Sequence, residues 1–141
     1  GPDETKVVGS MAGLADSEIG ALLRAEDYGR AKRFYSDVLG LEVEDRPGSG
    51  PSGMVRASGG TGFMIYERPG MPAPQNTTLA FGVADFDAVV DDLRQRGVVF
   101  EEYDMPEMGL TTVDGVAVIE GTPMAWFLDT EGNILTIAPN R

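Results

Sequence analysis

Apolar residues recur at helical spacing in two separate stretches of the chain, and each stretch ends at a glycine. Between Asp27 and Gly40 the apolar positions lie three or four residues apart, which predicts a helix with one core-facing side. The same pattern recurs between Asp85 and Gly97. An aspartate is a favourable N-cap, and a glycine readily adopts the left-handed conformation that ends a helix. The sequence therefore predicts the same helical unit twice.

Shorter apolar runs on either side of these helices predict strands. In the first half they cover residues 19–25, 41–45, 54–58 and 62–67, with a hairpin turn at Gly59-Gly60. In the second half they cover residues 77–84, 98–103, 113–120, 123–129 and 134–138, with a loop at 104–110 and a tight turn at 130–133. Each half reads as β-α-β-β-β, so we expect an α+β fold.

The repeat also predicts how the chain is divided. Module one covers about residues 17–68 and module two about 77–139, and the linker between them, 69–76, is rich in proline. We interpret residues 11–141 as a single domain. Residues 1–10 begin with Gly-Pro and resemble a remnant of tag cleavage, so that Met11 would be the natural start.

Charge and composition narrow the class of partner. The net charge is −12; residues 1–70 contain eleven acidic and eight basic residues, and residues 71–141 contain twelve and three. Such a surface repels phosphate backbones, which argues against nucleic-acid binding. It would attract a cationic ligand, or it would simply be a solvated acidic face that keeps the protein soluble. No apolar run approaches the roughly 20 residues that span a bilayer. The chain has no cysteine, which fits a reducing compartment and predicts a cytoplasmic protein.

Three motifs, in this order and spacing, resemble the vicinal oxygen chelate superfamily of glyoxalases, bleomycin resistance proteins and dioxygenases. They are Asp27 with AKRFY at 31–35 and LGL at 39–41; FGVAD at 81–85 leading to LRQRGV at 93–98; and WFLDTEGNI at 126–134. The resemblance covers roughly residues 17–139. It implies two tandem βαβββ modules that form an open, cup-shaped mixed β-sheet with the helices outside, often completed in a homodimer.

The same resemblance implies a divalent metal in the cup, held by His and Glu side chains. The corresponding positions fall near Gly20, at Met64 or Ile65, at Thr77 or Thr78, and at Thr136. These residues are poor ligands for transition metals, which bind imidazole, thiolate or carboxylate groups. The chain also contains no histidine. We therefore predict no metal, no other cofactor and no catalytic residue of the family type.

Side-chain alternation along the strands predicts what lines the cup instead. The expected wall is apolar and aromatic, with hydroxyl groups and one guanidinium, which describes a binding pocket. The predicted ligand-binding residues are Leu22, Arg24, Met64, Tyr66, Thr78, Met124, Trp126 and Thr136.

Several of these residues also have a structural interpretation. Trp126 would stack on a flat ligand, or it would fill the mouth of the cup or a dimer interface. Arg24 would bind an anionic oxygen, or it would pair with Glu26, Glu67 or another acid. Tyr66 would donate a hydrogen bond to a ligand, or it would cap a strand edge.

Two acidic features of the second module also have two readings. The cluster Glu101, Glu102, Asp104 and Glu107 would attract a cationic ligand, or it would be ordinary solvent-exposed surface with no role in binding. Asp129, in the turn, is expected to hydrogen-bond its own backbone.

Three classes of function remain open. The favoured hypothesis is a metal-free protein that binds a small aromatic or cationic molecule, as in drug or metabolite sequestration and antibiotic resistance. The alternative is a lyase or isomerase of the glyoxalase or dioxygenase type, either metal-free or with an atypical carboxylate site drawn from Glu26, Glu67 and Glu120. The third is a pure interaction module for a partner protein.

Overall fold

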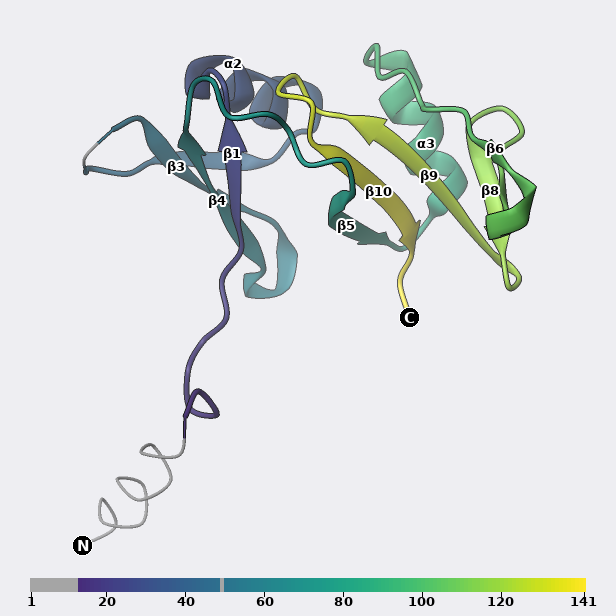
Figure 1. Cartoon of the computed structure of the whole chain (residues 1–141), viewed down its shortest axis with the longest axis horizontal. Coiled ribbons are helices and arrows are strands. Elements are labelled where there is room, and N and C mark those ends of the chain that lie inside the picture. Colours follow the sequence, from purple (N-terminus) through teal and green to yellow (C-terminus); the bar gives the residue numbers. More distant parts are fainter. Residues whose placement is uncertain (1–12, 49) are drawn as a thin grey trace, which may run out of the picture.

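The computed structural model describes residues 13–48 and 50–141 and contains two four-stranded sheets. The interpretation of residues 1–10 as a tag remnant lies outside the described residues. The predicted α+β fold class with two βαβββ modules is confirmed, and Figure 1 shows the two open sheets with the helices to one side of them.

The first sheet has the strand order β1-β4-β3-β2. Its strands are β1 (Leu22–Ala25), β2 (Glu42–Asp45), β3 (Ser52–Arg56) and β4 (Gly62–Glu67). The β1–β4 pair is parallel and the other pairs are antiparallel. The predicted hairpin at Gly59 is confirmed, and a short 3-10 turn, η2 (Ser58–Gly60), connects its strands.

The second sheet repeats this order as β5-β10-β9-β8. Its strands are β5 (Thr77–Val83), β8 (Val116–Ile119), β9 (Thr122–Leu128) and β10 (Ile134–Pro139). Again the first and last strands, β5 and β10, pair in parallel. The repeat predicted from the sequence is thus a repeat of topology.

Each helix begins where the sequence predicts. The carboxylate of Asp27 accepts a hydrogen bond from Arg30 N, and that of Asp85 accepts one from Ala88 N. The second helix, α3 (Phe86–Gln95), is regular, and Phe86, Val90 and Leu93 are buried on one side of it. The first is α2 (Tyr28–Arg33), which continues into a π-helical turn, η1 (Phe34–Val38).

Several predicted strand boundaries are wrong: β3 covers Ser52–Arg56 rather than 54–58, and β8 begins at Val116 rather than at 113. Two larger differences concern the first strand and residues 98–103. The first strand begins at Leu22 rather than at residue 19, and Ile19 is 98% exposed, so Gly20 is not in a strand. Residues 98–103 form only a single bridge, from Phe100 to Phe127. The next residues turn away because Tyr103 N donates a hydrogen bond to Thr112 Oγ1 instead of joining the sheet.

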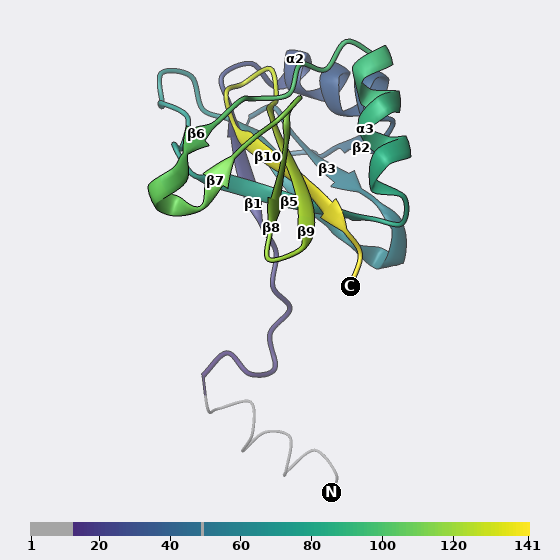
Figure 2. The same ribbon diagram turned by 90° about the vertical axis from the view of Figure 1, so that its right-hand side faces the viewer.

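The predicted loop at 104–110 contains short elements of its own. They are β6 (Asp104–Met105), the 3-10 turn η3 (Pro106–Met108) and, next to them, β7 (Leu110–Thr111), which pairs with β6. Figure 2 shows the β6–β7 ribbon beside the strands of the second sheet. The β6–β7 ribbon and residues 98–103 thus lie beside the second sheet, and Tyr103 covers Trp126 of that sheet. The strand pattern alone does not predict this arrangement.

One hydrophobic core serves both modules. Phe34 lies 6.5 Å from Phe127 of the second sheet, while Tyr35 lies 5.4 Å from Phe63 of the first, measured between ring centroids. The first helix therefore packs against both sheets. Among the described residues no helix is long and apolar enough to cross a membrane.

The β9–β10 turn, Asp129–Asn133, fixes one module to the other. Asp129 Oδ1 accepts hydrogen bonds from the backbone N–H groups of Glu131 and Asn133, both at 2.8 Å, which confirms its predicted structural role. Asp129 Oδ2 accepts a bond from Tyr35 Oη at 2.6 Å. The turn of module two thus reaches a buried tyrosine of module one, whose phenol pKa is raised by that burial.

Glu131 makes the second connection. Its carboxylate accepts hydrogen bonds from Arg30 Nε at 2.8 Å and Arg30 Nη2 at 3.0 Å, and from Asp27 N at 2.9 Å. Burial alone would raise the pKa of Glu131, but these bonds and one from Thr130 lower it from 4.5 to about 2. The ionised carboxylate is therefore the form that joins the modules.

We predict that Tyr35→Phe lowers the free energy of unfolding by about 1–3 kcal/mol, because Asp129 Oδ2 loses a buried donor. Chemical denaturation measures the change. Tyr66→Phe is the matched control, since Tyr66 Oη makes no hydrogen bond to a described residue, and we expect it to change stability by less than about 0.5 kcal/mol. Equal effects of the two variants would contradict the role of the Asp129 contact.

We also predict that Glu131 makes stability depend on pH. The folded-state pKa of Glu131 lies below its unfolded value, so between pH 4.5 and about 2 the unfolded chain binds more protons and stability falls as pH falls. The contribution above pH 4.5 should be about 2 kcal/mol, a figure reduced for the 45% exposure of the Arg30 side chain. Glu131→Gln should remove it, so that wild type and variant converge near pH 2.

Denaturant titrations at several pH values test this dependence. The control is Asp92→Asn, which removes the exposed pair with Arg96 on α3 and should cost less than about 0.5 kcal/mol at any pH. A wild-type advantage over Glu131→Gln that stays constant down to pH 2 would refute the assignment.

Candidate functional site

The eight residues predicted to bind a ligand lie on the outer faces of the two sheets, the faces that point away from the shared core. Alternation fixes this placement, since Leu23 and Ile65 of the first sheet and Phe127 and Leu135 of the second belong to the core. Four of the eight lie on the first sheet and four on the second.

The outer face of the first sheet carries two cross-strand pairs. Leu22 lies beside Met64, and Arg24 lies beside Tyr66, across the parallel β1–β4 pair. Leu22 is 63% exposed although it is a large apolar side chain. A cavity of about 360 Å³ borders Leu22, Met64 and Met54, together with residues 18–21 before β1 and residues 60–63 at the hairpin. The structure therefore brings two of the predicted residues to a real hollow.

Arg24 is buried and is largely committed to the contact between modules. Its Nη1 donates to Glu131 O at 2.8 Å and lies 3.4 Å from Asn133 Oδ1, while its Nε has no hydrogen-bond partner among the described residues. The predicted alternative partners are occupied elsewhere: the carboxylate of Glu26 accepts from Gly70 N and that of Glu67 from Tyr28 N. Arg24 thus joins carbonyl and amide oxygens rather than a carboxylate.

The outer face of the second sheet is covered. Trp126 and Thr136 are cross-strand neighbours on β9 and β10, and both are buried. The ring of Tyr103 packs edge-on against Trp126, with centroids 5.6 Å apart. Burial, and then the nearby Glu101, raise the pKa of the Tyr103 phenol. A flat ligand could reach Trp126 only after Tyr103 moves, so ligand stacking by Trp126 stays a prediction.

The two threonines at positions that the resemblance assigns to metal ligands use their hydroxyl protons within the sheet. Thr136 Oγ1 donates to Ala125 O at 2.9 Å, and Thr78 Oγ1 donates to Ile134 O at 3.1 Å. No group of three or more His, Cys, Asp or Glu residues in the described part of the chain could hold a metal ion. The residues present therefore do not fit the metal of the family.

The acidic cluster of module two has a structural part. Glu102 Oε1 accepts hydrogen bonds from Thr112 Oγ1 at 2.6 Å and Gly115 N at 2.9 Å. The bond from Thr112, followed by that from Gly115, lowers the pKa of Glu102. This carboxylate holds the β6–β7 ribbon in place, which leaves Glu101, Asp104 and Glu107 as the candidates for attracting a cation.

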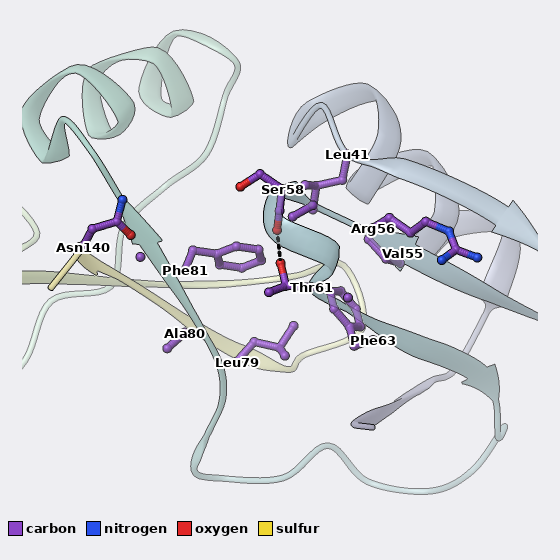
Figure 3. Close-up of a pocket in the computed structure, with 13 residues that line it drawn as sticks. Leu41, Val55, Arg56, Ser58, Thr61, Phe63, Leu79, Ala80, Phe81 and Asn140 are labelled. Atoms are coloured by element: carbon purple, nitrogen blue, oxygen red, sulfur yellow. Dashed lines mark hydrogen bonds between the residues drawn. The ribbon is translucent and has the colours of Figure 1, made fainter. Parts of the chain in front are cut away.

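A further cavity, not predicted from the sequence, lies between the modules. It has a volume of about 370 Å³ and lies between β5 and the β3–β4 hairpin (Figure 3). Phe81 and Leu79 border it from β5, and Leu41, Val55 and Phe63 from module one. Leu41, Leu79 and Phe81 are only half-buried in the structure, but from the sequence alternation assigns all three to the core, so no pattern reveals the cavity.

Sequence and structure comparisons place this architecture among known proteins. A family model for the Glyoxalase/Bleomycin resistance protein/Dioxygenase superfamily matches residues 19–137. The chain belongs to this superfamily. A search of curated proteins found no match.

Solved structures of the superfamily's fold resemble the chain over most of its length. The glyoxalase family protein from Enterococcus faecalis is 23% identical, with a TM-score of 0.65 over 86% of this chain and 97% of that one. TnmS3, an antibiotic binding protein from Streptomyces sp. CB03234, is 21% identical, with a TM-score of 0.59 over 88% and 97%. Lactoylglutathione lyase from Agrobacterium tumefaciens is 17% identical, with a TM-score of 0.62 over 87% and 93%. At these identities the likeness shows the glyoxalase-superfamily fold alone.

We predict that divalent metals do not stabilise this superfamily member. Protein dialysed against chelator and then given Mn²⁺, Ni²⁺ or Zn²⁺ should melt at the same temperature as the metal-free protein, because binding to the native state alone would raise it. Stoichiometric metal by elemental analysis, with a melting temperature that rises with metal and falls again in Glu120→Gln, would contradict this prediction and restore a carboxylate site.

Proposed function

We propose that this protein binds a small apolar molecule with at least one ring, on the outer face of the first sheet and without a metal ion. One observation carries the proposal: Leu22, Met54 and Met64 line an open hollow of about 360 Å³. Leu22 and Met64 lie on the strands to which the family resemblance assigns metal ligands. A volume of this size falls in the range of about 300–1,000 Å³ that is usual for small-molecule sites.

The chemistry of the lining supports an adaptable apolar site. Two methionines border the hollow, and their flexible thioethers can repack around ligands of different outline. Arg56 contributes the positively charged group at the rim, where its guanidinium also lies 3.8 Å from Glu44. An exposed pair of this kind contributes little to stability, so a polar substituent of a ligand can compete for Arg56.

The second half of the site is proposed to come from the outer face of the second sheet, with Thr78, Met124, Trp126 and Thr136. In a homodimer, a second copy would supply this wall next to the exposed Leu22. The movement required is a rotation of Tyr103 off Trp126, and the Tyr103 ring is only partly buried.

The biological role that fits such a site best is sequestration of a drug or metabolite. The antibiotic-binding description of TnmS3 supports an antibiotic as the ligand class. A lyase or isomerase activity would need a base, and two of the three candidate carboxylates, Glu26 and Glu67, already accept backbone hydrogen bonds. Sequestration is therefore the function we propose, with cationic aromatic compounds among its candidate ligands because of the acidic surface.

Titration with two fluorescent ring compounds tests this function. Neutral 9-anthracenemethanol and cationic acridine orange should quench Trp126, the single tryptophan, by energy transfer to a saturable level. Met64→Asp should weaken binding at least about tenfold, because it places a charge in the apolar hollow.

Val99→Asp is the matched control, since Val99 is 80% exposed and does not border the hollow. It should leave both titrations unchanged. If neither compound quenches Trp126 saturably, or if Met64→Asp and Val99→Asp behave alike, the proposed site is wrong.

A further inference from the structure

A third cavity, smaller than the two described above, lies on the core-facing side of the second sheet. It has a volume of about 150 Å³. Leu39 and Leu41 of module one form one wall, and Val89 and Leu93 of α3 form the other. The floor is the core face of the second sheet, including Phe81. The cavity is therefore separated from the outer-face site by the sheet itself.

Every side chain that borders this cavity is a hydrocarbon. The hollow is open to solvent, but its side chains offer a water molecule no hydrogen-bond partner. Enclosed apolar cavities of about 150 Å³ bind a benzene ring, so a hollow of this volume has room for a six-carbon ring. Size and chemistry thus agree on an apolar occupant of about six carbon atoms.

The local backbone keeps this cavity open. Leu39 follows the π-helical turn η1, in which Leu39 N donates to Phe34 O, five residues earlier, at 3.0 Å. A π turn is wider than an α turn, and such turns are frequent at functional sites. Next to this turn, Leu39 and Leu41 are only half-buried although they pack against the core, and so is Val89 on the facing helix α3.

The small cavity adjoins the larger cavity between the modules, because Leu41 and Phe81 border both. The larger one, of about 370 Å³, has a polar rim that includes the exposed residues Ser58 and Asn140 (Figure 3). Together the two cavities offer a hydrocarbon end and a hydrogen-bonding end.

We propose that the cleft between the modules is a second ligand site, which binds a small amphiphile. Its ring or short alkyl group lies between Leu39 and Val89, and its polar group lies beside Ser58 and Asn140. The hydrocarbon end shares no lining residue with the hollow on the first sheet, whereas the larger cavity shares Arg56, Thr61, Gly62 and Phe63 with it. An occupant contacts both modules and therefore stabilises their association.

Two probes, benzene and benzyl alcohol, separate the two ends of the cleft. In NMR spectra of the methyl groups and backbone amides, both probes should shift Leu39 and Val89 saturably. Benzyl alcohol should in addition shift Ser58 and Asn140. Shifts confined to Met64 and Met124 would place the probes on the outer faces and overturn the proposal. Shifts of Leu39 on dilution of the protein without probe would show that a second copy covers the cavity, and would overturn it as well.

Filling the cavity provides the decisive variant. Val89→Phe should reduce the affinity for both probes at least tenfold, whereas Val118→Phe, at a 67% exposed position outside the cavity, should not change it. If Val89→Phe does not fold, Val89→Ala provides the test. Because Val89→Ala enlarges the cavity, it should raise the affinity for naphthalene relative to benzene, compared with wild type. Unchanged preference in Val89→Ala, or undiminished binding in a folded Val89→Phe, refutes the site.

Discussion

The contact between the β9–β10 turn and the first helix is the constraint on which the remaining structure depends. The buried residues of the two modules form one continuous core cluster, so closing this core requires both modules to lie together. Asp129 and Glu131 fix the second module where Phe34 can pack on Phe127 and Tyr35 on Phe63. Because these acids are held by donors from the other module, the polar contact and the shared core specify the same arrangement. The positions of both cavities between the modules follow from that arrangement.

The two faces of the second sheet differ in chemistry, which is the basis for proposing two separate sites on one small chain. On the core side, residues such as Leu135 and Ile137 hold the modules together, and the space left beside the π turn is lined by carbon. On the outer side, polar groups such as the hydroxyl of Thr136 are tied to the sheet's own carbonyls. The two proposed sites rest on molecular shape and apolar contact, and the described part of the chain has no group of three or more His, Cys, Asp or Glu residues that could hold a metal.

Much of the fold was predictable because local rules agree with one another along the chain. The aspartate caps at Asp27 and Asp85, the glycine ends and the alternating strands each specify one element, and the repeat specifies their order. Residues 98–103 were misassigned because their pattern is that of a strand, while Tyr103 N donates to the distant Thr112 Oγ1 and Glu102 accepts from Gly115 N, which diverts them from the sheet. The site was harder to predict, since alternation identifies the face of a residue but not what covers it. Tyr103 over Trp126 and the π turn beside Leu39 are such tertiary effects.

The turn at Asp129–Asn133 has one more consequence, which concerns the connectivity of the chain. The bonds that dock module two onto module one involve Tyr35, Arg30 and Asp27, and the proline-rich linker supplies none of those donors. The same bonds could therefore form whether the turn belongs to the same chain or to a second copy. Two copies could exchange second modules and keep each of these bonds, as in domain swapping. Only the length of the linker and the protein concentration would then decide between a closed monomer and an intertwined pair.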